Sequence, residues 1–183
     1  MFIKIKDLEL RKIEFAENFA PGVIGLGEDI EQKGQLRSSG RAELVEETRE
    51  ARQVVKDIRV VGSFTVNVET RCARCLEPVS NSLSESFDLL YRPQGIDATG
   101  EDASIGPSET EIGYYQGEGL HLEEVLKEQI LLALPAKQIC SPGCKGLCPH
   151  CGRNLNLETC HCAVTIADPR WGALEEIRKK LEH

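Results

Sequence analysis

The sequence predicts an α+β protein in which a curved or barrel-like antiparallel β-sheet is followed by a helix and a cysteine-rich C-terminal module. Three observations lead to this fold class. Residues 54–91 hold two runs of alternating apolar and polar side chains, residues 120–134 carry apolar side chains at helical spacing, and residues 140–162 contain six of the eight cysteines. The expected organisation is a β-rich domain over 1–93, an acidic flexible linker over 94–118, and a third segment over 119–183.

The strongest strand signal lies in residues 54–70. Its apolar positions repeat every second residue and are mostly β-branched, which is typical of a half-buried strand: Ile58, Val60, Phe64, Val66 and Val68. Gly62 falls within this stripe and predicts a bulge or bend. A second alternating run covers 79–91, so we expect an antiparallel hairpin with residues 71–78 at its tip.

The rest of the N-terminal half is less regular. Residues 2–6 alternate like an edge strand, and a short strand is favoured over a helix for 41–52. Residues 14–40 carry several glycine and serine turn signals without a clean period, which predicts loops with at most one short strand.

Two helices are expected in the third segment. In residues 120–134 a stripe of apolar side chains faces a row of charged ones, and Pro135 ends the helix. The pair Asp168-Pro169 is a strong start signal for a closing helix. The apolar face of that helix would be formed by Trp171, Leu174, Ile177 and Leu181.

Composition limits the classes of protein that this sequence can encode. The 183 residues fit one domain, or one domain with a small module, and no run approaches the roughly 20 apolar residues of a membrane helix. The N-terminus lacks the apolar core of a secretory signal, so we expect a cytoplasmic protein. Cysteines in that setting are metal ligands or redox thiols rather than disulfides.

The net charge of −8 is unevenly distributed along the chain. Residues 137–183 hold seven Lys or Arg against five Asp or Glu, whereas residues 1–136 hold 15 against 25. An acidic body repels phosphate at long range. If the protein contacts RNA, we therefore expect the cysteine module and its tail to form the contact.

The cysteine module predicts a structural zinc site. Cys148 and Cys151 flank a two-residue turn and precede Gly152, as in a zinc knuckle, and Zn²⁺ prefers four such thiolates in tetrahedral geometry. The spacing does not choose four ligands from six, and a two-metal cluster with bridging thiolates could use them all. His150 and His161 could substitute, although a solvent-facing position is favoured for both. The candidate ligands are Cys140, Cys144, Cys148, Cys151, Cys160 and Cys162.

About one zinc ion per chain is expected from this module. An iron–sulfur cluster is disfavoured because the spacing matches neither of the common ferredoxin patterns. A catalytic zinc site would need an open ligand position and a base. Glu158 is the one acidic residue in the module and nothing in the sequence marks it as a base, so a structural zinc site is favoured.

The hairpin tip holds the remaining two cysteines, Cys72 and Cys75, which admit three interpretations. They could be two further metal ligands, a redox dithiol or structural cysteines in a tight turn. Redox pairs usually open a helix, whereas this pair follows a strand, so a structural or recognition role is favoured. Arg71 and Arg74 could stabilise a thiolate or bind phosphate.

No enzyme motif accompanies these cysteines. The sequence has no GxSxG, Walker loop, HExxH or GxGxxG pattern, and it has four histidines. We therefore expect a protein without enzymatic activity and without a small-molecule substrate.

Three motifs in order resemble the YceD family, a widespread bacterial family with chloroplast relatives. They are CARCLEP at 72–78, CKGLCPHCGRNLN at 144–156 with Cys160 and Cys162, and DPRWGAL at 168–174. The resemblance implies a role in the accumulation of large-subunit (23S) ribosomal RNA, metal binding in some members, and no enzymatic activity. Members that lack the second motif still carry the first, so the resemblance favours a recognition role for Cys72, Arg74 and Cys75.

Two functional hypotheses follow. The first is a non-enzymatic factor that binds large-subunit rRNA, its precursor or a large-subunit ribosomal protein, with no membrane contact. The alternative is a zinc-thiolate redox sensor that releases zinc on oxidation. The first is favoured mainly by the resemblance.

Overall fold

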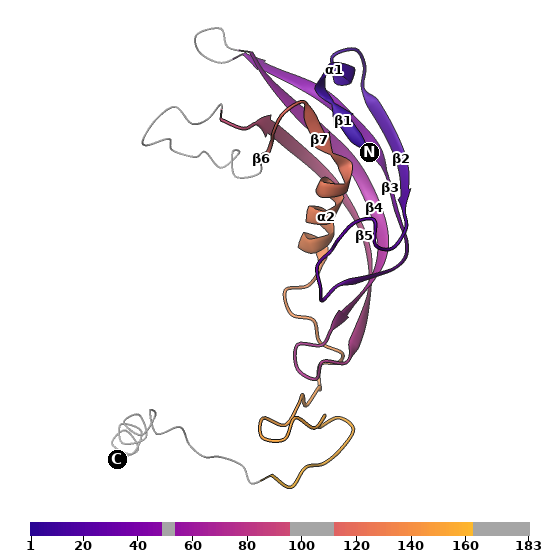
Figure 1. Ribbon diagram of the computed structural model, residues 1–183, viewed down its shortest axis with the longest axis vertical. Helices are drawn as coiled ribbons and strands as arrows, with labels where there is room; N and C mark the ends of the chain where they lie inside the picture. The colour runs from indigo at the N-terminus through magenta and orange to yellow at the C-terminus, as the bar shows by residue number, and fades with distance from the viewer. Residues whose placement is uncertain (49–53, 96–111, 163–183) are drawn as a thin grey trace, which may run out of the picture.

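The computed structural model describes residues 1–48, 54–95 and 112–162, which form a long curved sheet with one helix on its concave side (Figure 1). The elements in chain order are β1 (Phe2–Lys4), α1 (Ile5–Leu8), β2 (Ile13–Phe19), β3 (Glu31–Thr48), β4 (Val54–Arg71), β5 (Pro78–Pro93), β6 (Ile112–Tyr115), β7 (Gly119–His121) and α2 (Leu122–Ala133).

The main sheet is open and mixed rather than a barrel. Its strand order is β2-β3-β4-β5-β6, with antiparallel pairs throughout except for the parallel pair β5–β6. β1 and β7 form a separate antiparallel pair. The barrel-like form that we expected is therefore wrong, because β2 and β6 do not pair with each other and both remain edges of the sheet.

Two facing glycines let the sheet bend around its core. Gly40 on β3 and Gly62 on β4 are direct cross-strand partners. A Cβ on Gly40 would lie 2.3 Å from the carbonyl oxygen of Val61 and 2.8 Å from the ring of Phe15. The pairing register stays continuous at Gly62, so this residue makes a bend and no bulge. The register shifts instead between Lys33 and Arg37.

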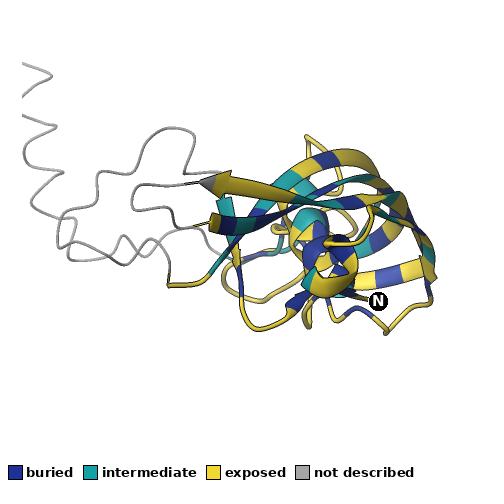
Figure 2. Cartoon of the chain, turned by 90° about the horizontal axis from the view of Figure 1, so that it is seen from above, coloured by how far each residue is buried: buried dark blue, intermediate teal, exposed yellow. Residues whose placement is uncertain are grey.

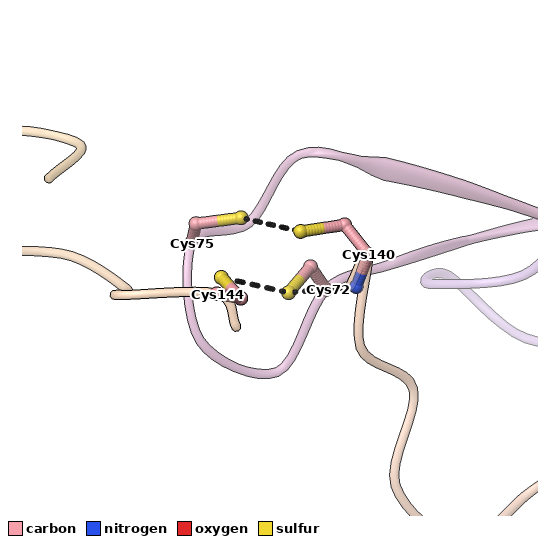
Figure 3. Close-up of side chains that lie close together, drawn as sticks. All are labelled: Cys72, Cys75, Cys140 and Cys144. Atoms are coloured by element: carbon pink, nitrogen blue, oxygen red, sulfur yellow. Dashed lines mark hydrogen bonds between the residues drawn. The ribbon is translucent and has the colours of Figure 1, made fainter. Parts of the chain in front are cut away.

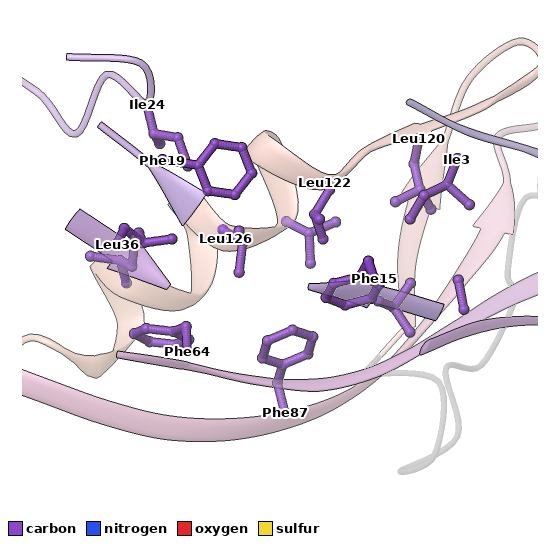
Figure 4. Packing of buried hydrophobic residues seen from close by; sticks show 14 of the residues in the cluster. Ile3, Phe15, Phe19, Ile24, Leu36, Phe64, Phe87, Leu120, Leu122 and Leu126 are labelled. Atoms are coloured by element: carbon purple, nitrogen blue, oxygen red, sulfur yellow. The ribbon is translucent and has the colours of Figure 1, made fainter. Parts of the chain in front are cut away.

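α2 packs its apolar stripe into the concave face of the sheet. Leu122, Leu126 and Ile130 are fully buried, and Figure 2 shows the sheet arching over one side of the helix. Figure 4 shows Leu126 near the rings of Phe64 and Phe87, which come from β4 and β5. This single core joins the sheet to the helix that leads to Cys140.

The β4–β5 hairpin and α2 confirm the periodic signals, whereas the loops expected over 14–40 are wrong. That region contains β2 and most of β3. The inward positions of β3 hide its period because several are polar or small: Gln32 donates to the carbonyl of Phe19 at 3.0 Å, and Ser38 donates to that of Ser63 at 3.0 Å.

The structure describes part of the expected linker and none of the expected closing helix. β6 lies inside the range expected as a linker, and residues 96–111 of that range lie outside the described residues. The closing helix after Asp168 also lies outside the described residues.

Candidate metal centres

The tip of the β4–β5 hairpin meets the segment that follows α2 and brings four cysteines together (Figure 3). In this tip cluster all four Sγ atoms lie within 4.8 Å of one another, and its members are Cys72, Cys75, Cys140 and Cys144. The Sγ atoms of Cys72 and Cys144 are 3.9 Å apart, and those of Cys75 and Cys140 are 3.6 Å apart. A tetrahedral zinc site with Zn–S bonds of about 2.3 Å needs sulfurs about 3.8 Å apart, and the separations of these two pairs are close to that value.

A tight turn at the hairpin tip aims the first two thiols at this point. The N–H of Leu76 donates to the carbonyl of Cys72 at 3.0 Å, and the N–H of Arg74 donates to the Cys72 sulfur at 3.4 Å. Leu76 takes a φ of +62°, the only non-glycine residue of the described chain with positive φ. The turn therefore has the geometry of a zinc knuckle, with a leucine where glycine is usual.

The remaining four cysteines form a second group, the terminal cluster. Their Sγ atoms also lie within 4.8 Å of one another, and the members are Cys148, Cys151, Cys160 and Cys162. The N–H of Gly152 donates to the carbonyl of Cys148 at 2.9 Å, and Gly152 has a φ of +72°. Cys148–Gly152 thus repeats the turn of Cys72–Leu76.

Hydrogen bonds hold the segment after α2 against the hairpin tip. The N–H of Ala73 donates to the carbonyl of Gln138 at 2.8 Å, and that of Leu147 donates to the carbonyl of Arg74 at 3.0 Å. The guanidinium of Arg74 donates to the carbonyl of Cys144 at 2.9 Å. These hydrogen bonds hold residues 138–147 against the hairpin tip, so that cysteines from both segments can share one cluster.

A small side-chain network supports the outer side of the tip cluster. Asn156 donates from Nδ2 to the Cys144 sulfur at 3.3 Å, and its Oδ1 accepts from the N–H of Lys145 at 2.8 Å. Asn154 donates to Glu77 at 3.1 Å and so connects the loop between Cys151 and Cys160 to the residue before β5. Partners of this kind orient metal ligands and stabilise their charge.

Hydrogen bonds and crowding separate the pKa values of the clustered thiols. The backbone N–H groups of Cys140 and Cys75 lower the pKa of Cys72 to about 6. At Cys75 the N–H of Glu77 lowers the pKa, but burial and the neighbouring sulfurs outweigh it and raise the pKa to about 12. Four thiolates in so small a volume repel one another, and a bound dication would remove that repulsion.

The thiols of the terminal cluster show the same separation of pKa values. The backbone N–H groups of Cys151 and His150 lower the pKa of Cys148 to about 6. The sulfur of Cys151, followed by burial, raises the pKa of Cys162 to about 12. Both groups of thiols therefore have the donor chemistry of a closed four-thiolate site, in which every ligand position is filled by protein.

This arrangement differs from a single site formed by the last six cysteines. Cys140 and Cys144 join the distant pair Cys72 and Cys75, which favours the metal-ligand interpretation of that pair over the redox one. Arg74 is exposed, yet its guanidinium donates to carbonyls of the cysteine segment. His150 and His161 are exposed and are not members of either cluster.

Sequence reasoning missed how the cysteines pair, although one signal was available. The sequence contains two CxxC pairs, and each has the spacing of a zinc-knuckle turn. Eight cysteines with two such turns are enough for two four-ligand sites, each built on one turn.

Comparison with known proteins gives the family. The family model of the large ribosomal RNA subunit accumulation protein YceD matches residues 60–178. The chain belongs to the YceD family. The match includes both cysteine clusters, the greater part of β4 and all of β5 and β6, but neither β2 nor β3.

Relatives of this YceD-family chain occur in bacteria and plants. An uncharacterized protein of Mycobacterium tuberculosis is 34% identical over 126 residues, which cover 68% of this chain and 57% of the relative. The chloroplastic large ribosomal RNA subunit accumulation protein YCED homolog 1 of Arabidopsis thaliana is 25% identical over 148 residues, which cover 69% of this chain and 46% of the relative. The chain thus spans about half the length of these curated relatives.

No solved structure matches the chain. Within the described part of the chain, no helix combines the length and apolar character needed to cross a membrane.

Proposed function

We propose that this protein is a non-enzymatic factor in the accumulation or maturation of large-subunit ribosomal RNA, and that it acts by binding RNA or a ribonucleoprotein through its cysteine end. The cysteine end comprises residues 71–79 and 137–162. Membership of the YceD family supports the link to large-subunit rRNA. The observation that carries the proposal is the set of exposed basic side chains that lie next to the cysteines of the two clusters.

Apart from the cysteines, the charged side chains of the cysteine end are mostly basic, whereas those of the body are mostly acidic. Its two acidic residues are Glu77 and Glu158, and its five basic residues are Arg71, Arg74, Lys137, Lys145 and Arg153. All five basic side chains are exposed, and each lies within three residues of a cluster cysteine in the sequence. Fixed basic groups on a rigid loop can contact phosphates of one RNA backbone, whereas the acidic body is repelled by it.

In this proposal each cluster binds one structural Zn²⁺. The cysteine end has little apolar core of its own, since the buried residues that pack together at the tip are three of its cysteines, Cys72, Cys75 and Cys144. Small modules of this kind depend on a metal for their folding free energy. The zinc ions would fix the basic residues in space and take no part in a reaction.

Crosslinking in cells tests this function. The protein is crosslinked to its partners in cells and purified, and the RNA bound to it is sequenced. The experiment compares the wild type with a triple variant, Arg71→Ala, Lys145→Ala, Arg153→Ala. The matched control is Lys4→Ala, Arg37→Ala, Lys127→Ala, which removes the same charge from exposed positions outside the cysteine end.

We expect enrichment of large-subunit rRNA or its precursor with the wild type and the control, and a loss of at least tenfold with the first variant. Three phosphate contacts account for a loss of this size. Equal crosslinking of all three proteins would exclude the cysteine end as the contact. Crosslinks to a large-subunit ribosomal protein alone would replace RNA by that protein as the direct partner.

A zinc-thiolate redox sensor is the second proposed function, because one cysteine of each cluster, Cys140 and Cys151, is exposed. Hydrogen peroxide would oxidise two zinc-bound thiolates to one disulfide, releasing Zn²⁺ and, with two protons, forming two waters. Zinc release at micromolar peroxide, reversed by thiol reductant, would support this function. Clusters that keep zinc under those conditions would exclude it.

A further inference from the structure

A hollow with different chemistry from the cysteine clusters lies beside the first half of α2, at the other end of this helix from Cys140. It has a volume of about 530 Å³ and is bordered by β5, β6, β7 and the N-terminal strand. The side chains that matter for its chemistry are Phe2, Tyr91, Tyr114, His121, Glu124 and Glu128. A volume of this size falls in the range of small-ligand sites.

Two carboxylates on α2 face the hollow without a cationic partner. Glu124 and Glu128 are one helical turn apart and both are exposed. Neither forms an ion pair with any residue in the described ranges. Like charges at this spacing destabilise a helix by about 0.2–0.5 kcal/mol, so a bound cation would relieve a repulsion that the fold leaves in place.

A mostly buried tyrosine side chain also reaches this hollow. Tyr91 on β5 is 8% exposed and lines the hollow, yet its hydroxyl has no hydrogen-bond partner among the described residues. Burial, and then the charge of Glu128, raises the pKa of Tyr91, so the group stays a neutral phenol that can accept a hydrogen bond.

The ring of Tyr91 is held in position by the strand beside it. Gly113 on β6 is its direct cross-strand partner, and a Cβ there would lie 2.6 Å from the Tyr91 ring. The hydroxyl of Tyr91 is therefore fixed at the wall of the hollow, where it can accept a hydrogen bond from the donor group of a ligand.

Aromatic rings complete the mouth of the hollow. The rings of Phe2 and His121 are 4.6 Å apart and tilted by 44°, and Tyr114 is 53% exposed. Cations bind favourably against aromatic faces, and a planar guanidinium does so more often than an ammonium. These walls favour an organic cation over a metal ion, which would need more oxygen ligands than this site offers.

We propose that this hollow binds the guanidinium group of an arginine in a basic segment of a partner polypeptide. The guanidinium has five N–H donors, enough for Glu124, Glu128 and the Tyr91 hydroxyl together. The acidic body attracts basic chains at long range and so increases their rate of encounter. The inference goes beyond the rRNA function and stands on the geometry of the hollow alone.

The test is a titration of the full zinc-loaded chain, followed by NMR of its backbone amides. The probes are a short arginine-containing peptide with blocked ends, the same peptide with lysine for arginine, and spermidine as a free polyamine. The variants are Glu124→Gln with Glu128→Gln, and Tyr91→Phe. The charge-matched control is Glu14→Gln with Glu28→Gln, two exposed carboxylates outside the hollow.

We expect saturable shifts of the amides of 113–128 with the arginine peptide and at least threefold weaker binding of the lysine peptide. The double Glu variant should weaken binding at least tenfold and Tyr91→Phe about threefold, while the control binds as the wild type does. Tighter binding of spermidine than of the arginine peptide would overturn the polypeptide source. Absence of saturable shifts, or an equal loss in the control, would overturn the site itself.

Discussion

Leu76 and Gly152 occupy equivalent positions in the two cysteine turns, at φ values of +62° and +72°. A left-handed conformation costs a residue with a side chain about 1–2 kcal/mol, whereas glycine adopts it freely. Contacts at the tip, including the hydrogen bond from Arg74 to Cys144, must compensate for this cost in the first turn.

The variants Leu76→Gly and Gly152→Ala should therefore have opposite effects. We expect Leu76→Gly to keep its zinc and its stability or gain up to about 1 kcal/mol, and Gly152→Ala to lose about 1 kcal/mol. Urea unfolding of the zinc-loaded proteins measures both. A clear loss of stability in Leu76→Gly would mean that contacts of the leucine side chain outweigh the cost of its backbone conformation.

Gly40 is required for a different reason, the close approach of two strands and a ring. Gly40→Ala would place a methyl group 2.3 Å from the carbonyl oxygen of Val61, so the backbone must move. We expect a loss of about 1–3 kcal/mol in the free energy of unfolding. Gly25→Ala, where no atom lies within 4 Å of the added Cβ, should change stability little and serves as the control. Equal stability of the two variants would contradict the tight register described for β3 and β4.

At the scale of elements, α2 is what connects the sheet to the cysteine end. Leu126 is fully buried between the helix and the sheet, so Leu126→Ala should destabilise the protein by about 2–5 kcal/mol. Leu132→Ala, at a position that is 71% exposed, should cost little. Thermal unfolding of both variants checks this prediction, and similar losses would show that α2 does not depend on its buried face.

The elements also show how far sequence reasoning reaches. The β4–β5 hairpin and α2 were predictable because their apolar positions repeat at the period of the structure that they form. β3 was not, because Gln32, Ser38 and Gly40 stand at inward positions and interrupt the stripe. A cysteine cluster with the donors of a metal site was predictable near the C-terminus. Which cysteines share a cluster depends on where α2 places Cys140, and spacing along the chain does not encode that position.

For the whole molecule, pH should act through the cysteines. Cys72 and Cys148 have pKa values lowered to about 6, so their thiolates contribute stability above the ordinary thiol pKa of about 8.5. This contribution is lost as the pH falls from about 8.5 to 6. Zinc competes with protons for the same sulfurs and should move the loss to lower pH.

Urea midpoints at pH 8.5 and 6.5, with zinc and with EDTA, measure this effect. We expect the EDTA-treated protein to lose stability between the two pH values and the zinc-loaded protein to change less. The same pH dependence with and without zinc would contradict a role for the cysteines as zinc ligands.

At this largest scale the two clusters have a clear division of roles. The tip cluster links residues that are 65 and more positions apart in sequence and fastens the cysteine end to the sheet. The terminal cluster closes a loop of nearby residues. Loss of the tip cluster should therefore free residues 137–162 from the hairpin, whereas loss of the terminal cluster should leave the tip intact.

The most direct measurement is the number of zinc ions per chain by native mass spectrometry, in the wild type and in Cys72→Ser. Two four-thiolate sites predict two zinc ions in the wild type and one in Cys72→Ser, with one also in Cys148→Ser. A single zinc ion in the wild type that persists in Cys72→Ser would contradict the account, because Cys72 would then not be a ligand.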